Sequence, residues 1–325
     1  MGVVASAPAK VILFGEHFVV YGEPAIVLAI DKRAYAKVEL RTDKRIYVHS
    51  TNLGISGYFE ESNFQPEKGD ERARYRLEPI KKVVDKISEI SGKNTGLNIE
   101  IRSTVPVAAG LGSSAAVAAA TTMAVAEILE VKLSREDIFR ITYEAERIVH
   151  GTPSGVDPAI ATFGGTILFQ MDTGVRPLEV KMEIPLVIGD THVSRSTRDL
   201  VARVREKHER FPSIVEPILR SGRQIVLQAI EAMRQGDIKT LGELADINHA
   251  LLCAVGVSCE TLEWLITNAR KAGALGAKLT GAGGGGCMIA LTEPDRMETV
   301  AEAIQHAGGT PYIARKTNEG VRIEP

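Results

Sequence analysis

The chain has 325 residues, of which 44% are hydrophobic and 25% charged, and its formal net charge is −2. This ordinary composition predicts a folded protein of two domains, and so small a net charge gives no reason to expect a nucleic-acid partner. Three cysteines without a C-x-x-C pair and seven histidines without H-E-x-x-H spacing argue against disulfides or a transition-metal site, and for a reduced, cytoplasmic setting.

Strand patterns dominate the first hundred residues. Alternating apolar residues predict strands over residues 10–14, 25–30, 34–40 and 46–50, with a turn at residues 21–24. The polar, charge-dense stretch 60–76 is expected to form an exposed loop. Helical spacing over residues 77–90 ends at Ser91 and Gly92, and a strand is predicted over residues 97–102.

Residues 105–126 form the longest uncharged stretch and nominally reach the length of a membrane span. Because Pro106, Gly110 and Gly112 interrupt this stretch and its second half is mostly alanine, we expect a buried helix after a glycine loop. The N-terminal apolar run is short and contains Lys10, which is typical of neither a signal peptide nor a membrane anchor. No membrane partner is therefore expected.

A capping-box pattern at Ser134 predicts the start of a helix that runs to about residue 149. A strand is predicted over residues 166–170, and the polar stretch 174–183 marks a boundary between domains 1–180 and 181–325. The elements expected beyond it are a strand (186–189), three or four helices between residues 196 and 272, a strand (287–291), a helix (295–306) and two strands (311–316, 321–323). Strands and helices without regular alternation predict two α+β domains.

The segment Gly110-Leu-Gly-Ser-Ser114, before an alanine-rich helix, carries the strongest chemical signal. Glycines let the backbone approach a ligand, and a helix start offers unpaired N–H groups and a positive dipole end. This combination suits polyphosphate, and a hydroxyl there can bind Mg²⁺. The segment is not a G-x-x-x-x-G-K-[ST] loop, and with Ala115 it also fits the weak dinucleotide pattern. A glycine turn that only packs the helix is the alternative.

Residues 281–286 form a second glycine loop that contains four consecutive glycines. A strand is predicted to follow it, and this is the wrong context for a dinucleotide site. A flexible linker is the alternative interpretation. Because the loop lies between Lys278 and an apolar strand, close approach of its backbone to a ligand explains the glycines better.

Two acidic residues near the middle of the chain are candidates for chemistry. Glu146 falls on the flank of the apolar face of its helix, where a carboxylate needs a partner such as a metal ion. An edge glutamate that reaches water fits the same position. Asp157 follows the helix and could orient a substrate hydroxyl and accept its proton. An ordinary turn aspartate also fits that pattern.

The N-terminal strand carries polar residues whose pattern is ambiguous. Lys10 lies in an otherwise apolar strand, either as a lysine that reaches water at an edge or as an ammonium near phosphate. Glu16 and His17 end the strand, either as a surface turn or as part of a substrate pocket. Each segment alone favours the simpler structural interpretation.

Together these segments resemble a known family. Residues 8–17, 106–116 and 278–287 are similar, in this order, to the three motifs of the GHMP kinases, and the resemblance spans essentially the whole chain. Residues 5–22, 146–157 and 194–199 further resemble the members of this family that phosphorylate mevalonate. Ala9 and Thr152 depart from the common glycine and asparagine, and neither change removes a group with a chemical role.

The resemblance implies an α+β fold of two domains. The first would contain a left-handed β-α-β crossover around the phosphate loop, the second would be ferredoxin-like, and the active site would lie in the cleft between them. The implied reaction transfers the γ-phosphoryl group of ATP to the primary hydroxyl of mevalonate, with Mg²⁺ as cofactor. ATP and mevalonate are therefore the expected partners, and a homodimer is left open.

The roles of the family's residues carry over to matching positions of this sequence. Ser114 and Glu146 would hold Mg²⁺, and Asp157 would be the catalytic aspartate with Lys10 close to it. Residues expected to line the mevalonate pocket are Glu16, His17, Arg195 and Thr197. Residues expected to bind ATP are Pro106, Ala109, Gly110, Leu111, Gly112, Ser113, Ser114, Gly283 and Gly284.

Three alternatives share parts of this pattern. A kinase of the same family that acts on phosphomevalonate or homoserine would carry the same motifs. An NAD-dependent oxidoreductase would need a strand before the glycine loop, a helix after it, and an acidic residue about 20 positions further on. A non-catalytic ligand-binding relative is disfavoured, because Lys10, Ser114, Glu146 and Asp157 are all present.

Overall fold

The computed structural model describes residues 2–61, 63–105, 110–151, 153–194 and 196–325. Over these ranges the larger of two sheets contains nine strands in the order β13-β1-β2-β6-β3-β4-β5, with β7 paired to β2 and β8 paired to β7. Its strands are β1 (Val3–Phe14), β2 (Ala25–Leu40), β3 (Ile46–Ser50), β4 (Ile55–Glu60), β5 (Asn63–Lys68), β6 (Leu97–Ser103), β7 (Thr166–Gln170), β8 (Gly174–Pro177) and β13 (Arg322–Ile323). Strands β3 and β6 pair in parallel, and the other pairs are antiparallel.

Strand β2 is continuous where two strands were expected. Its first part pairs with β7 and its second part with β6, while β1 follows it along most of its length. The register shifts between Pro8 and Ala9, which face Arg33 and Ile30. Asp31 and Lys32, which lie between the two expected strands, are therefore the extra residues of a bulge, and such a bulge bends a strand without ending it.

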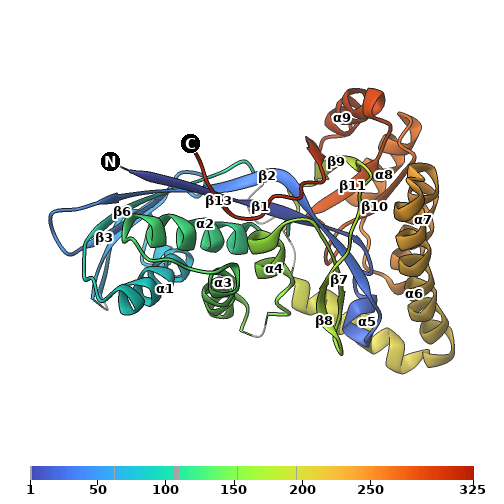
Figure 1. Ribbon diagram of the computed structural model, residues 1–325. Coiled ribbons are helices and arrows are strands. Elements are labelled where there is room, and N and C mark those ends of the chain that lie inside the picture. Colours follow the sequence, from blue (N-terminus) through green and yellow to red (C-terminus); the bar gives the residue numbers. More distant parts are fainter. Residues whose placement is uncertain (1, 62, 106–109, 152, 195) are drawn as a thin grey trace.

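Four helices cover one face of this sheet (Figure 1). They are α1 (Ala73–Ser91), α2 (Ser113–Ile128), α3 (Arg135–His150) and α4 (Val156–Phe163). Helix α2 contacts β1 and β2 through alanines that are almost completely buried, which confirms the predicted buried helix. Among the described residues, no helix combines the length and the apolar character that crossing a bilayer requires.

The smaller sheet has the order β10-β11-β9-β12, and every pair in it is antiparallel. Its strands are β9 (Pro185–Asp190), β10 (Gly276–Leu279), β11 (Cys287–Leu291) and β12 (Thr310–Arg315), and its helices are α5 (Thr197–Arg210), α6 (Pro212–Gln235), α7 (Ile238–Val255), α8 (Glu260–Lys271) and α9 (Met297–His306). Helices separate β9 from β10 and β11 from β12, so the connection is the β-α-β-β-α-β pattern of ferredoxin-like domains. This confirms the predicted fold of the second half.

The two halves share a common apolar core and a returning C-terminus. Val11 and Leu13 of β1 belong to one buried cluster with Ile188 of β9 and Ile289 of β11. After β12 the chain crosses back, and β13 pairs with β1 beside the N-terminus (Figure 1). The last residues of the sequence therefore belong to the sheet formed by its first residues.

Other local predictions also differ from the structure. Residues 60–76 do not form a loop, because β5 pairs with β4 and α1 begins at Ala73. Strand β5 lies at the edge of the sheet with mostly polar side chains, so its only clear apolar signal is Phe64, whose ring packs 4.8 Å from that of Phe59. Helix α4 was also missed, since Asp157 and Pro158 suggested a turn; proline is tolerated in the first turn of a helix.

Candidate active site

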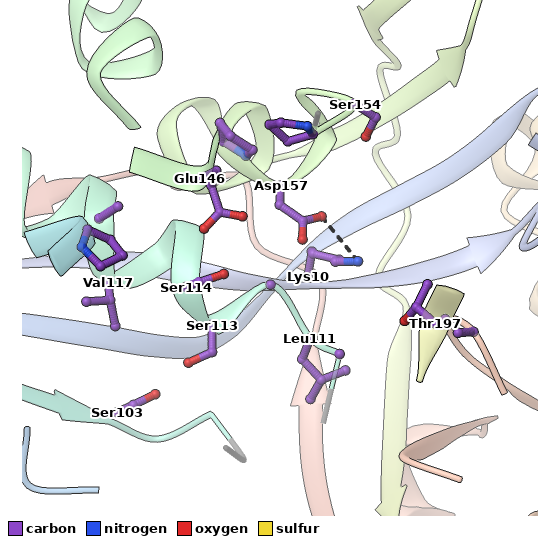
Figure 2. A pocket seen from close by; sticks show the side chains of 18 of the residues that line it. Lys10, Ser103, Leu111, Ser113, Ser114, Val117, Glu146, Ser154, Asp157 and Thr197 are labelled. Carbon is purple, nitrogen blue, oxygen red and sulfur yellow. Dashed lines mark ion pairs between the residues drawn. The ribbon is translucent and has the colours of Figure 1, made fainter. Parts of the chain in front are cut away.

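A cavity of about 800 Å³ lies where β1, the start of α2 and the ends of α3 and α4 meet (Figure 2). Predicted site residues that line it are Lys10, Glu16, His17, Gly110, Leu111, Gly112, Ser113, Ser114, Glu146, Asp157 and Thr197. They come from segments up to 187 positions apart in the sequence, between Lys10 and Thr197. The structure thus brings most of the predicted site residues to one space.

The glycine loop enters helix α2 through backbone conformations that favour glycine. Gly110 and Gly112 have φ angles of 77° and 71°, in the left-handed region, and Gly112 is the N-cap of the helix. The N–H of Lys10 donates a hydrogen bond of 2.9 Å to the carbonyl of Leu111, which ties the loop to β1. Ser113 and Ser114 therefore begin the helix at the cavity, where unpaired N–H groups and the helix dipole favour an anion.

Lys10 and Asp157 form an ion pair at the centre of this site. Lys10 Nζ lies 3.2 Å from Asp157 Oδ1, and their side chains are 9% and 29% exposed (Figure 2). Asp157 lies in the first turn of α4, where the helix dipole stabilises a negative charge. A Cβ on Gly112 would lie 2.9 Å from Lys10 Cγ and 3.6 Å from Asp157 Cγ. The absence of a side chain at Gly112 therefore allows the ion pair to lie against the glycine loop.

Glu146 lies on α3 at the same cavity and is only 2% exposed. In Figure 2 its carboxylate and that of Asp157 face the region above the start of α2, where Ser114 carries its hydroxyl. Two carboxylates and a hydroxyl are oxygen donors of the kind that Mg²⁺ prefers. The arrangement suits a divalent ion that is held next to a phosphate bound at the helix start.

Glu16 is buried and takes part in an ion pair with Lys278 of β10. Its Oε2 also accepts a hydrogen bond of 3.4 Å from Asn248 Nδ2 of α7. Burial raises the pKa of Glu16 and lowers the pKa of Lys278, while their mutual attraction opposes both shifts. Both carboxylate oxygens of Glu16 thus have partners from the second half of the chain, so a substrate hydroxyl would share an acceptor that is already engaged.

His17 connects β1 to the second glycine loop. It adopts a φ of 60°, which is uncommon for a residue other than glycine, and its Nε2 donates a hydrogen bond of 2.7 Å to the carbonyl of Ala282. Gly281 and Ala282 line the cavity beside it. Thr197, at the start of α5, is exposed and lies on the same wall.

The structure places Gly283 and Gly284 away from the cavity lining. A Cβ on Gly283 would lie 2.0 Å from the carbonyl oxygen of Val257, and one on Gly284 would lie 2.9 Å from Leu200 Cδ1. Close packing against the second half of the chain therefore requires these glycines, independently of any ligand. Pro106, Ala109 and Arg195 lie outside the described residues.

One end of the cavity is an apolar chamber that the sequence did not indicate. Its walls include Leu53, Tyr75, Ile80 and Val117. Two hydrogen bonds connect Asn52 beside the chamber to Ser103 at the end of β6. Asn52 Nδ2 donates to Ser103 O at 2.9 Å, and Asn52 Oδ1 accepts from Ser103 N at 2.6 Å. Apolar walls of this kind suit a flat, largely apolar ligand group. It was missed because Tyr75 lies in the stretch that was predicted to be a loop.

Lys278 and Asn248 were also missed as site residues. In the sequence, Lys278 lies next to apolar residues, and the same feature made Lys10 a candidate. Nothing in the sequence pairs Lys278 with Glu16, which lies 262 positions earlier. Asn248 lies on a helix without any local sign that its side chain is buried.

Comparison with known proteins agrees with these features. Residues 78–165 match the model of the GHMP kinases N terminal domain, and residues 229–310 match that of the GHMP kinases C terminal domain. The chain is 44% identical to a mevalonate kinase of Pyrococcus abyssi, with 99% of this chain and 98% of the relative covered. It is 36% identical to a mevalonate kinase of Aeropyrum pernix, with 98% of each covered.

A solved structure is similar over nearly the same length. The crystal structure of L. major mevalonate kinase in complex with R-mevalonate superimposes with a TM-score of 0.84 and 27% sequence identity. The match covers 97% of this chain and 96% of that chain. The match therefore extends over both halves of the chain.

Proposed function

Because this chain belongs to the GHMP kinases, and among them to the mevalonate kinases, we propose that it transfers the γ-phosphoryl group of ATP to mevalonate. The primary hydroxyl of mevalonate would be the acceptor, and the products would be 5-phosphomevalonate and ADP. Phosphoryl transfer needs positioning and charge stabilisation more than covalent chemistry from the protein. The candidate site offers both.

The ion pair between Lys10 and Asp157 is the observation that carries this proposal. Both side chains face the start of α2, where the triphosphate would bind. Asp157 is positioned to orient the acceptor hydroxyl and to accept its proton as the bond to phosphorus forms. Lys10 offsets the charge of this carboxylate and supplies a cation beside the transferring phosphoryl group.

Mg²⁺ fits the oxygen donors of this site. Glu146 supplies a buried carboxylate and Ser114 a hydroxyl at the helix start, and these residues would hold the ion. When bound, Mg²⁺ neutralises charge on the phosphate oxygens. Both residues line the same cavity, Ser114 at the end of the glycine loop and Glu146 on α3, which supports their assignment as ligands of an ion beside a bound triphosphate.

The two substrates would enter the cavity from opposite ends. The apolar chamber around Tyr75 and Val117 suits the adenine base, because aromatic and aliphatic walls cover a flat ring. Mevalonate would lie toward Glu16, His17 and Thr197, next to the second glycine loop. The cytoplasmic location and the homodimer stay predictions.

A coupled assay of ADP formation with mevalonate, phosphomevalonate, homoserine and galactose in parallel tests the proposal. We expect Mg²⁺-dependent turnover with mevalonate and little above background with the other three acceptors. Turnover that is faster with any of those three than with mevalonate would overturn the assignment of the substrate. Absence of turnover with all four acceptors would overturn the proposal that the protein is an active kinase.

A further inference from the structure

Helix α4 carries Asp157 and is too short to fix its own position. It contains eight residues, and an isolated helix of this length is not stable in water. Thr162 lies five residues after Asp157, which is about 7.5 Å along the helix axis. Val156, Ala159 and Ile160 pack in a buried cluster close to Asp157, and the contacts at the far end of α4 complete the support of this helix.

Arg135 holds that far end. Its Nη1 donates a hydrogen bond of 2.7 Å to the carbonyl of Thr162, one of the last carbonyls of α4, which lack partners within the helix. The same Nη1 donates a hydrogen bond of 2.6 Å to the carbonyl of Val321, near the C-terminus of the chain. Val321 N in turn donates a hydrogen bond of 3.2 Å to Thr162 O, so Arg135, Thr162 and Val321 form a junction of three hydrogen bonds.

The C-terminal segment 316–324 lies directly against α4. A Cβ on Gly320 would lie 2.1 Å from Thr162 O, and one on Gly164 would lie 2.5 Å from Gly320 N. The backbones are therefore too close for any side chain at these two positions. Val321 is fully buried in the core of the larger sheet, so the segment is not a loose tail.

Strand β2 anchors the same segment from its other side. Arg33 is buried, and its Nη2 donates to Gly320 O at 2.7 Å and to Ser6 O at 3.1 Å. Thr317 exchanges backbone hydrogen bonds with its neighbours, donating to Ala29 O and accepting from Gly165 N. The segment is thus a fixed support on the sheet, and Arg135 connects α4 to it.

We propose that Arg135 is a positioning residue for Asp157, acting through Thr162 and the C-terminal segment 316–324. The proposal rests on the proposed kinase function. Arg135 is the first residue of α3, and Glu146 lies near the other end of that helix. One side chain therefore joins the helix that carries the metal-binding carboxylate to the helix that carries the catalytic one.

The test compares Arg135→Met, which keeps most of the side-chain length and removes the donors, with Arg135→Lys, which keeps one cationic donor. Arg140→Met is the control, because Arg140 is exposed on the same helix and, within the described part of the chain, forms an ion pair with Asp137 at 3.9 Å. For each variant kcat, both KM values and the unfolding midpoint are measured with mevalonate and ATP. Hydrogen–deuterium exchange is followed in the peptide that covers residues 156–163.

We expect Arg135→Met to lower kcat about tenfold or more, because small misplacements of a catalytic group cost this much. Both KM values should change little, exchange in residues 156–163 should rise, and Arg135→Lys should recover most of the loss. A drop in the unfolding midpoint with kcat within twofold of the unaltered protein would overturn the proposal. Unchanged exchange in α4 would overturn it as well.

Failure of the proposed function gives a different result. If the unaltered protein does not phosphorylate mevalonate, the substrate assignment falls, while exchange in residues 156–163 still reports whether Arg135 holds α4. If the unaltered protein is active and Arg135→Met equals Arg140→Met in every measurement, only the positioning role is lost.

Discussion

Lys278 and Glu16 form an ion pair in which both side chains are fully excluded from solvent. The pair joins β10 of the smaller sheet to the end of β1 in the larger one, at the wall of the candidate active site. An interaction that crosses between the two halves at this point fixes the shape of the cavity that both halves form. Its removal should therefore affect stability and catalysis together.

Lys278→Met should destabilise the protein by about 3–5 kcal/mol, because it leaves the carboxylate of Glu16 buried without its partner. The double variant Lys278→Met with Glu16→Gln should recover much of this loss, since no buried charge remains. Urea unfolding measures both values, and Lys271→Met, at an exposed lysine, is the control. A single variant as stable as the control would contradict the account of the pair.

Gly112→Ala should lower kcat by at least about tenfold, because a methyl group there meets the stem of Lys10 and displaces it from Asp157. Gly236→Ala is a matched control: Gly236 has a similar φ of 73°, and its missing Cβ would meet nothing within 4 Å. Both substitutions put an alanine into the left-handed backbone conformation, which lowers the free energy of unfolding by about 1–2 kcal/mol. Steady-state kinetics should show that only Gly112→Ala loses activity; equal activity of the two variants would refute this explanation.

Glu146→Gln should raise the Mg²⁺ concentration that gives half-maximal activity, since a neutral amide is a weaker ligand than a carboxylate. Activity is measured across a Mg²⁺ titration at fixed ATP and mevalonate. Glu144→Gln, two positions earlier on the same helix, is the control. The same Mg²⁺ dependence in the Glu146 variant and the unaltered protein would rule out metal binding by this residue.

The stability of the protein should fall as the pH drops below about 6.5, in part because of His249. His249 Nδ1 accepts a hydrogen bond of 3.4 Å from Leu279 N, so its neutral form places the proton on Nε2, which lies 3.1 Å from Glu263 Oε1. Burial lowers the pKa of His249 below 6.5; Glu263 opposes this shift, and Arg270 and Lys278 add to it. The unfolded chain therefore binds the proton more tightly, and acid favours unfolding.

The measurement is the unfolding midpoint between pH 7.5 and pH 5 for the unaltered protein and for His249→Asn, which keeps an acceptor near Leu279 N. The variant should lose less stability over this range. His306→Asn, at an exposed histidine, should behave like the unaltered protein. Parallel curves for all three proteins would show that His249 does not contribute.

Local signals predicted much of the fold. Residues 166–170 and 287–291 were predicted as strands with the bounds that the structure shows, because glycines precede an apolar run in both. The capping box is also confirmed: Ser134 Oγ accepts from Asp137 N, and the Asp137 side chain accepts from Ser134 N. Strand β5 and helix α4 were missed because an edge strand needs few apolar residues and because proline suits a first helical turn as well as a loop.

The candidate site could be predicted only in part from the sequence. Lys10, Ser114, Glu146 and Asp157 were identified through the resemblance to a family, while each alone was ambiguous. The Lys278 partner of Glu16 and the Arg135 junction depend on contacts between distant segments. No local pattern encodes such contacts, because they exist only after the two sheets and the C-terminal segment have come together.

Single-turnover transfer from ATP to mevalonate tests the central claim most directly. The rate is measured by rapid quench for the unaltered protein, for Asp157→Asn and for Asp172→Asn, an exposed aspartate away from the cavity. Asp157→Asn should slow transfer by about 10²-fold or more while the Kd for ATP stays unchanged, and Asp172→Asn should have no effect. Transfer by Asp157→Asn at a rate close to that of the unaltered protein would contradict the role assigned to the Lys10–Asp157 pair.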